Sequence, residues 1–169
     1  LSRAELKPGD KAADLGTGRE GKMALLASSV VGENGIVYAV DVVKDILPTV
    51  ATKARMRGLN NIQTVWSDLE VYQATRVIRD NTLAAAFLVT VLFQSQKRQA
   101  ILREAYRMIR PGGKLIVADW KPALKTALGP DVSLRVESSE IEQYAEELHL
   151  RVQDHFEAGP YHWGLVLVK

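Results

Sequence analysis

The most informative absence in this sequence is cysteine, which does not occur once among the 169 residues. Without cysteine the chain has no disulfide framework, no thiolate zinc site and no thiol nucleophile, so several enzyme classes are excluded at once. Histidine is also scarce, with three residues, and we expect no metal site. A chain without cysteine fits a reducing compartment, so we expect a cytoplasmic protein.

Long apolar runs and a strong net charge are missing as well. No stretch approaches the ~20 apolar residues of a membrane-spanning helix, and the first ten residues lack the pattern of a signal peptide. We therefore expect a soluble protein without membrane association. The 22 basic and 20 acidic residues leave a formal charge of +2 and form no dense Lys/Arg block, so nucleic acid is not indicated as a partner.

What the sequence does contain is ample apolar material and a regular alternation of strand and helix patterns. Hydrophobic residues make up 47% of the chain, enough for one continuous core, so we predict a single domain over residues 1–169. Short apolar runs predict strands, and segments with helical spacing of apolar residues follow them. The predicted strands are 11–15, 36–40, 62–67, 83–92 and 115–120; the predicted helices are 23–31, 44–57, 70–79 and 96–109; residues 122–130 are a predicted loop.

The last part of the chain has a different pattern. Ser139 and Glu142 form a capping-box pattern that predicts a helix to about residue 150. Two strands follow, 151–157 and 161–168, and the connection between them is too short for a crossover helix, so they form an antiparallel hairpin. Five alternating units and this hairpin predict an α/β fold with a seven-stranded, mostly parallel sheet of order 3-2-1-4-5-7-6, in which strand 7 is antiparallel.

The glycine-rich segment 14–21, with the sequence DLGTGREG, is the strongest candidate for a ligand site. It lies between the first strand and the first helix, where glycines allow a tight turn and the first N–H groups of the helix are unpaired. Asp41 ends the second strand, where a carboxylate can bind both hydroxyls of a ribose, and Asp68 follows the third strand at the same edge. Two alternatives stay open: a tight turn without a ligand, and Asp41 as a helix N-cap.

These motifs resemble those of the class I S-adenosylmethionine-dependent methyltransferases, within them the ubiquinone/menaquinone C-methyltransferase-like group. The resemblance covers essentially the whole chain. It is carried by ADLGTG at 13–18, VYAVD at 37–41, SD at 67–68, LFQ at 92–94, EAYRMIRPGGK at 104–114 and the closing hairpin. It implies a Rossmann-like three-layer α/β/α sandwich, S-adenosylmethionine as cofactor with S-adenosylhomocysteine as product, and methyl transfer as the activity.

The resemblance also implies a set of cofactor-binding residues. They are Asp14, Gly16, Thr17, Gly18, Asp41, Val42, Asp68 and Leu69. In the family the glycine loop faces the methionine half of the cofactor. By the same resemblance Asp14 supports the loop or binds the amino group, Asp41 binds the ribose, and Asp68 binds the adenine amino group while Leu69 packs on the ring.

The sequence departs from the family pattern at two points. The third glycine of the family falls at position 20, which holds Glu20, and Gly21 follows; an inserted residue is our preferred explanation. The acidic residue that is common near the start of the fourth strand is missing, because residues 83–87 are wholly apolar. The first departure concerns the shape of the loop, and the second concerns catalysis or packing.

The ends of the fourth and fifth strands provide the candidates for the methyl-acceptor site. The substrate-binding candidates are Thr90, Phe93, Gln94 and Trp120, and the weak candidates for a catalytic base are Asp119 and His162. Core packing is the alternative role for the two aromatic residues, and a structural hydrogen bond is the alternative for the histidine. The Asn/Asp-Pro-Pro-aromatic loop of nucleic-acid amino methyltransferases is absent, and the lack of cysteine excludes pyrimidine C5 and arsenite methylation. We therefore expect a small, partly apolar acceptor.

Two other functions fit parts of the pattern. A nucleotide-dependent oxidoreductase would also have the glycine loop and the acid after the second strand, but no Tyr-x-x-x-Lys pair occurs and the terminal hairpin does not fit a simple dinucleotide-binding fold. A non-catalytic relative that binds the cofactor or a partner remains an alternative because of Glu20 and the apolar fourth strand.

Overall fold

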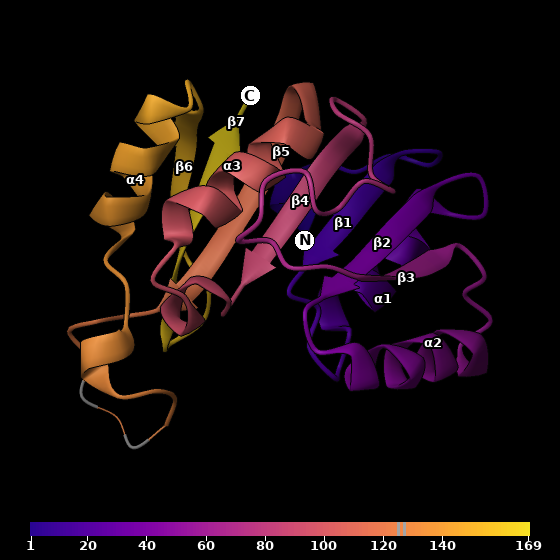
Figure 1. Cartoon of the computed structure of the whole chain (residues 1–169), viewed down its shortest axis with the longest axis horizontal. Coiled ribbons are helices and arrows are strands. Elements are labelled where there is room, and N and C mark those ends of the chain that lie inside the picture. The colour runs from indigo at the N-terminus through magenta and orange to yellow at the C-terminus, as the bar shows by residue number, and fades with distance from the viewer. Residues whose placement is uncertain (125, 127) are drawn as a thin grey trace.

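The structure is a computed structural model that describes residues 1–124, 126 and 128–169 (Figure 1). The other two residues belong to the loop predicted at 122–130 and lie outside the described residues. The strands are β1 (Lys11–Leu15), β2 (Ile36–Asp41), β3 (Ile62–Trp66), β4 (Leu83–Val89), β5 (Ile109–Trp120), β6 (Arg151–Glu157) and β7 (His162–Val168). The helices are α1 (Lys22–Val31), α2 (Leu47–Met56), α3 (Arg98–Met108) and α4 (Ser138–Glu147), with short 3-10 helices η1 (Ser2–Ala4), η2 (Lys44–Ile46), η3 (Leu92–Gln94) and η4 (Val132–Leu134).

The described strands form one sheet of order β3-β2-β1-β4-β5-β7-β6. Neighbouring strands from β3 to β5 are parallel, whereas β7 is antiparallel to both β5 and β6. This confirms the predicted sheet order and the single antiparallel strand. The carboxyl ends of β1, β2, β3 and β4 therefore meet at one edge of the sheet, where open α/β folds bind their ligands.

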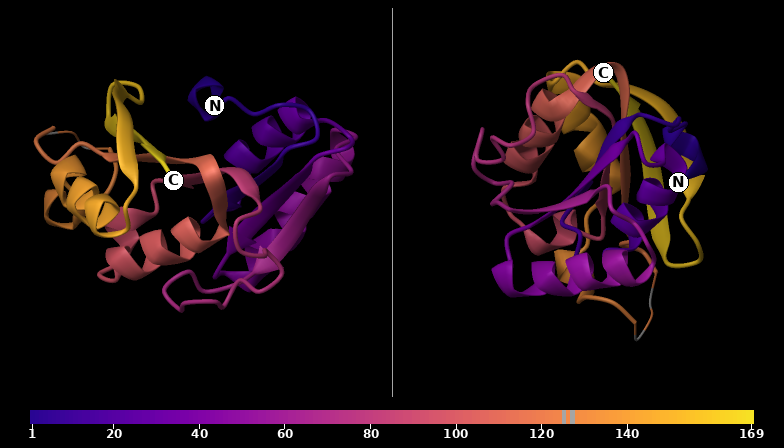
Figure 2. Two further views of the ribbon diagram at one scale, coloured as in Figure 1. Left: turned by 90° about the horizontal axis from the view of Figure 1, so that it is seen from above. Right: turned by 90° about the vertical axis from the view of Figure 1, so that its right-hand side faces the viewer.

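Helices cover both faces of the sheet, as the three-layer prediction requires (Figure 2). One core cluster packs α1 and α2 against the sheet around Phe87, and the other packs α3 and α4 around Leu102 and Ile141. Two of the three residue pairs between β1 and β4 are alanine pairs, Ala12 with Ala85 and Ala13 with Ala86. Strands covered on both faces are continuous apolar runs, which is why the central strands were recognisable in the sequence.

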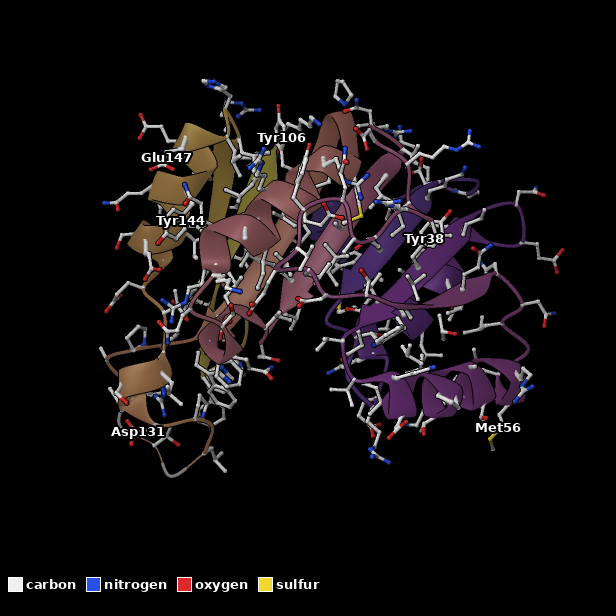
Figure 3. The ribbon with its side chains drawn as sticks, viewed as in Figure 1. Tyr38, Met56, Tyr106, Asp131, Tyr144 and Glu147 are labelled. Carbon is white, nitrogen blue, oxygen red and sulfur yellow. The ribbon has the colours of Figure 1, made fainter. Side chains whose placement is uncertain are left out.

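Most side chains of the central strands lie in the interior, and side chains on the outer faces of the helices lie at the surface, as expected for a sheet covered on both faces. Tyr38 lies on β2 inside the molecule, whereas Met56 at the end of α2 is 82% exposed and points away from it (Figure 3). Within the residues that the structure describes, no helix combines the length and hydropathy that crossing a membrane requires.

The prediction of a helix over residues 70–79 is wrong, because this segment consists of turns. Its backbone is held by side chains from α3 instead. Two of its N–H groups donate to the carboxylate of Glu104, and two of its carbonyls accept from the guanidinium of Arg107. Ile78 is buried in the core next to α3, so the segment is fixed without helical hydrogen bonds.

Three predicted boundaries also need correction. The fifth strand begins at Ile109 and not at residue 115, because residues 110–113 form a bulge inside β5, where Gly112 has a φ of 75°. The capping box does not form, because α4 begins at Ser138 with Glu137 as its N-cap, which leaves Ser139 inside the helix. The fourth strand stops at Val89, and the last residue of its predicted range, Leu92, is the first residue of η3.

Candidate cofactor site

Asp14 organises the turn between β1 and α1. Its carboxylate is buried, and one oxygen accepts hydrogen bonds from the Thr17 hydroxyl at 2.8 Å and from the Ala24 N–H at 2.9 Å. The N–H groups of Gly16 and Thr17 donate to the carbonyl of Val40 on the neighbouring strand. Burial raises the pKa of Asp14 to about 6, although these hydrogen bonds act in the opposite direction. Asp14 thus stabilises the loop through hydrogen bonds inside the protein.

Two of the loop glycines are required by close packing. A Cβ atom on Gly16 would lie 2.5 Å from a methyl carbon of Val91, and one on Gly21 would lie 2.7 Å from a methyl carbon of Val50. Both glycines also have a positive φ, 80° and 59°. Gly18 differs, because a Cβ atom there would meet nothing within 4 Å. Its backbone is therefore open to a ligand.

The departure at position 20 leaves the turn intact. Glu20 is exposed and forms an ion pair with Lys53 at 2.8 Å. Gly21 occupies the N-cap of α1 in the left-handed conformation. Gly21 thus provides the left-handed residue at the start of α1, one position after the third glycine of the family pattern.

Asp41 links the tip of β2 to the glycine turn. One carboxylate oxygen accepts the Gly18 N–H at 2.9 Å, and the other accepts the Val43 N–H at 2.9 Å. The side chain is buried and lines a cavity. The alternative role as a helix N-cap is not seen, since Val43 is the N-cap of η2 and no side chain caps it. A carboxylate accepts about four hydrogen bonds, so Asp41 retains capacity for two more.

The cavity has a volume of about 340 Å³ and lies at the carboxyl ends of β1, β2 and β3. This volume is within the range of small-molecule sites, roughly 300–1,000 Å³. The predicted cofactor-binding residues that line it are Gly16, Gly18, Asp41, Val42, Asp68 and Leu69. The lining residues that the sequence did not reveal are Val43, Ile46, Ser67, Glu70, Val91, Ser95 and Ile101. Several of these adjoin predicted residues in the chain, but Ser95 and Ile101 come from around η3 and from α3.

The substrate-binding candidates are not all at this cavity. Gln94 lines it, and its side-chain amide donates to the Thr90 carbonyl at 2.8 Å. Thr90 has a φ of 56°, which is rare for a β-branched residue and marks local strain. Phe93 packs partly against the core on the α3 side. Trp120 lies against His162, with 4.2 Å between ring centroids. Of the four, the structure brings Gln94 into the lining of the described cavity.

The two candidate bases have different surroundings. Asp119 is fully buried, and its carboxylate accepts the N–H groups of Leu92, Phe93 and Trp120. Burial raises the pKa of Asp119 against these hydrogen bonds. It therefore holds η3 in place and is badly situated to take a proton from an acceptor. His162 has a buried Nε2 atom without a hydrogen-bond partner among the described residues, and burial lowers the pKa of His162.

A glycine turn tied to the next strand, an acid at the tip of β2 and a cavity at the sheet edge are the features expected of a nucleotide-cofactor site on an open α/β sheet. The sheet order with its antiparallel β7 is that of the class I methyltransferases. The family model described as "Methyltransferase domain" matches residues 13–117. The chain belongs to this family and is a class I S-adenosylmethionine-dependent methyltransferase domain.

Curated relatives carry a more specific name. The ubiquinone/menaquinone biosynthesis C-methyltransferase UbiE of Blochmanniella floridana is 31% identical over 121 residues, covering 71% of this chain and 46% of its own length. The enzyme of the same name from Shewanella frigidimarina is 30% identical over 118 residues, covering 69% of this chain and 45% of its own. The chain therefore spans less than half the length of these relatives.

Solved structures agree on the architecture. A SAM-dependent methyltransferase from Aquifex aeolicus is 27% identical, with a TM-score of 0.84 over 96% of this chain and 83% of its own. The [4+2]-cyclase SpnF, 16% identical, has a TM-score of 0.80 over 99% of this chain and 78% of its own, and shows the fold alone. Fibrillarin of Aeropyrum pernix, solved with bound S-adenosyl-L-methionine, is 19% identical, with a TM-score of 0.74 over 99% of this chain and 74% of its own.

Proposed function

We propose that this chain binds S-adenosylmethionine in the cavity at the carboxyl ends of β1, β2 and β3, and transfers its methyl group to a small-molecule acceptor. The observation that carries the proposal is that one cavity unites the glycine turn, Asp41 and the Asp68–Leu69 pair. The UbiE relatives are named for the biosynthesis of ubiquinone and menaquinone, which supports a small, partly apolar acceptor. S-adenosylhomocysteine is then the product. We also propose a cytoplasmic location.

The residues around the cavity fit the chemical parts of this cofactor. The open backbone at Gly18 leaves room for the methionine half beside the turn. Asp41 has unused acceptor capacity for the two ribose hydroxyls. One oxygen of Asp68 accepts the Glu70 N–H at 2.9 Å, which leaves the other for an exocyclic amine. Leu69 and Ile101 supply apolar surface for a flat ring.

The reaction does not require a covalent intermediate with the protein. A bound S-adenosylmethionine supplies a methyl group that is already activated on a sulfonium sulfur. The chain then has to hold the acceptor in line and exclude water, effects that are worth up to ~7–11 kcal/mol through positioning. Gln94 on η3 borders the cavity, and we propose that Phe93 and Trp120 extend this border into an acceptor pocket.

A base is needed only for acceptors that must lose a proton, such as a hydroxyl, an amine or an acidic carbon. His162 is the better of the two candidates. Its lowered pKa favours the neutral ring, so the ring carries a nitrogen lone pair near neutral pH. Asp119 contributes indirectly by anchoring η3, the element that carries Phe93 and Gln94.

The proposal is tested with the purified chain in two steps. Calorimetry with S-adenosylmethionine and S-adenosylhomocysteine measures cofactor binding, for which we expect one site per chain. A screen with methyl-labelled S-adenosylmethionine, first on quinol and phenol acceptors, measures transfer of the label. Absence of binding would refute the cofactor site, and binding without transfer to any acceptor would favour the non-catalytic alternative.

A further inference from the structure

The turn segment 70–79 is fastened to α3 by a carboxylate that has no contact with solvent. Glu104 is completely buried. One of its oxygens accepts the Gln73 N–H at 2.8 Å, and the other accepts the Thr75 N–H at 3.2 Å. A buried carboxylate that binds two backbone donors of an irregular segment restricts that segment to one conformation.

Arg107 completes the fastening from the same helix. Its guanidinium is buried and donates to both oxygens of Glu104, at 3.0 and 2.7 Å. It also donates to the carbonyls of Thr75 and Ile78, at 3.2 and 2.9 Å, and to Asp80 at 2.6 Å. Burial would raise the pKa of Glu104, but the hydrogen bonds from Arg107 and the backbone lower it, so the carboxylate is ionised and the pair is fully satisfied.

A chain of hydrogen bonds connects this pair to the cofactor cavity. The Thr75 hydroxyl lies 2.9 Å from the Ser67 hydroxyl, and both side chains are buried. Ser67 begins the segment 67–70 that lines the cavity, which we call the cavity wall. At its other end, Glu70 accepts the Ser95 hydroxyl at 2.6 Å. The cavity wall is thus tied at both ends, and the tie at Ser67 leads back to Glu104.

We propose that Glu104 is a positioning residue of the cofactor site, which acts through Thr75 to hold the cavity wall and thereby sets the affinity for the nucleoside half of the ligand. This inference rests on the proposed function, because it takes the cavity as the nucleoside site. Glu104 itself does not line the cavity. Its contribution is preorganisation: a wall that is ordered before binding does not have to be ordered by the ligand.

A purely structural role for the pair makes a different prediction. In that case the loss of a contact lowers the stability of the fold and leaves the affinity of the folded protein unchanged. The positioning role predicts that the loss of a contact between the pair and the cavity wall lowers the affinity for the ligand. The loss of a contact elsewhere on the pair should lower the stability of the fold alone. Asp80 is suited as the matched control, because it binds Arg107 but is half exposed and does not line the cavity.

The decisive variants are at Thr75. Thr75→Val removes the hydroxyl that holds Ser67 but keeps the shape and the backbone bonds to Glu104, whereas Thr75→Ser keeps the hydroxyl. Binding of adenosine and of S-adenosylhomocysteine is measured by calorimetry. We expect Thr75→Val to weaken both ligands about tenfold, as expected for the loss of one buried hydrogen bond. Thr75→Ser should restore the affinity of the unaltered chain.

Glu104→Gln and Asp80→Asn extend the test to the pair itself. Glu104→Gln should weaken adenosine and S-adenosylhomocysteine by the same factor, while Asp80→Asn should lower the melting temperature without changing either affinity. If Glu104→Gln does not fold, the two Thr75 variants decide. Wild-type affinity in both Thr75→Val and Glu104→Gln would overturn the positioning role. An unaltered chain that binds neither ligand would instead refute the proposed function, and this inference with it.

Discussion

At the scale of single residues, the assignment of the cavity depends most on Asp41. This carboxylate lies at the point where β2, the glycine turn and the cavity meet, and both of its oxygens already accept backbone N–H groups. Its remaining acceptor capacity faces the proposed ribose position. We therefore propose that Asp41 both shapes the turn and binds the ribose hydroxyls of the ligand.

Replacement of Asp41 by Asn should weaken S-adenosylhomocysteine binding by about 1.5–3 kcal/mol, because the amide keeps the shape but loses the charge and one acceptor oxygen. Calorimetry gives the change in dissociation constant. Asp45→Asn is the matched control, since Asp45 is exposed and does not line the cavity. Equal affinities of the Asp41 variant and the control would contradict the ribose assignment.

Asp14 should make stability depend on pH in a recognisable way. Because burial raises its pKa to about 6, above the value of an unfolded aspartate, the folded state binds the extra proton more tightly. The stabilisation of the folded state by this proton is complete below pH ~4 and is lost as the pH rises through about 6. The loss amounts to up to ~3 kcal/mol in the free energy of unfolding.

The variant Asp14→Asn isolates this effect. Both the Thr17 hydroxyl and the Ala24 N–H bind the same carboxylate oxygen, so an amide oxygen can keep both bonds. We expect the free energy of unfolding of the variant, relative to the unaltered chain, to rise between pH 4 and 7. Urea denaturation at several pH values measures the difference, and a flat difference would show that the raised pKa is wrong.

Residues of the site were predictable where the feature is local in sequence. The glycine turn, Asp41 and Asp68 follow strand ends directly, so strand prediction placed them together. Ser95 and Ile101 reach the cavity from other elements, and nothing near them in the sequence marks a ligand site. Asp119 was predicted near the acceptor, but the sequence could not show that η3 would fold over its carboxylate.

At the scale of elements, the turn between β1 and α1 is the most constrained connection. Replacement of Gly16 by Ala should destabilise the protein through both its positive φ and the contact with Val91. Gly58→Ala is the control, because Gly58 also has a positive φ of 69° but a Cβ atom there meets nothing within 4 Å. We expect the free energy of unfolding to fall by about 1–2 kcal/mol in the control and by ~1–3 kcal/mol more in Gly16→Ala. Equal losses of stability in the two variants, measured by urea denaturation, would show that the contact with Val91 does not constrain position 16.

Elements were predictable where the apolar pattern alone decides them. The buried strands are continuous apolar runs, and α1 and α3 carry their apolar residues on one face. The segment 70–79 failed because its hydrogen-bond partners, Glu104 and Arg107, are distant in the sequence and replace the bonds of a helix. The bulge in β5 was missed for a related reason, since Pro and Gly in a strand usually mark its end.

At the scale of the whole molecule, the sheet order was predicted from the five alternating units and the terminal hairpin. Right-handed crossovers between parallel strands leave few arrangements, and the short link before β7 excludes a crossover there. The resulting fold is shared by proteins with different reactions, such as the cyclase SpnF and the Aquifex aeolicus methyltransferase. The function therefore has to be decided at the cavity, where Gly18, Asp41 and Asp68 come together.

The most direct test is a crystal structure of this chain grown with saturating S-adenosylhomocysteine. The account predicts the ligand in the cavity, with the ribose hydroxyls on the Asp41 carboxylate, the adenine between Leu69 and Ile101, and the amino-acid end beside Gly16 and Gly18. A structure with the ligand bound elsewhere, or with the cavity empty at saturation, would contradict it.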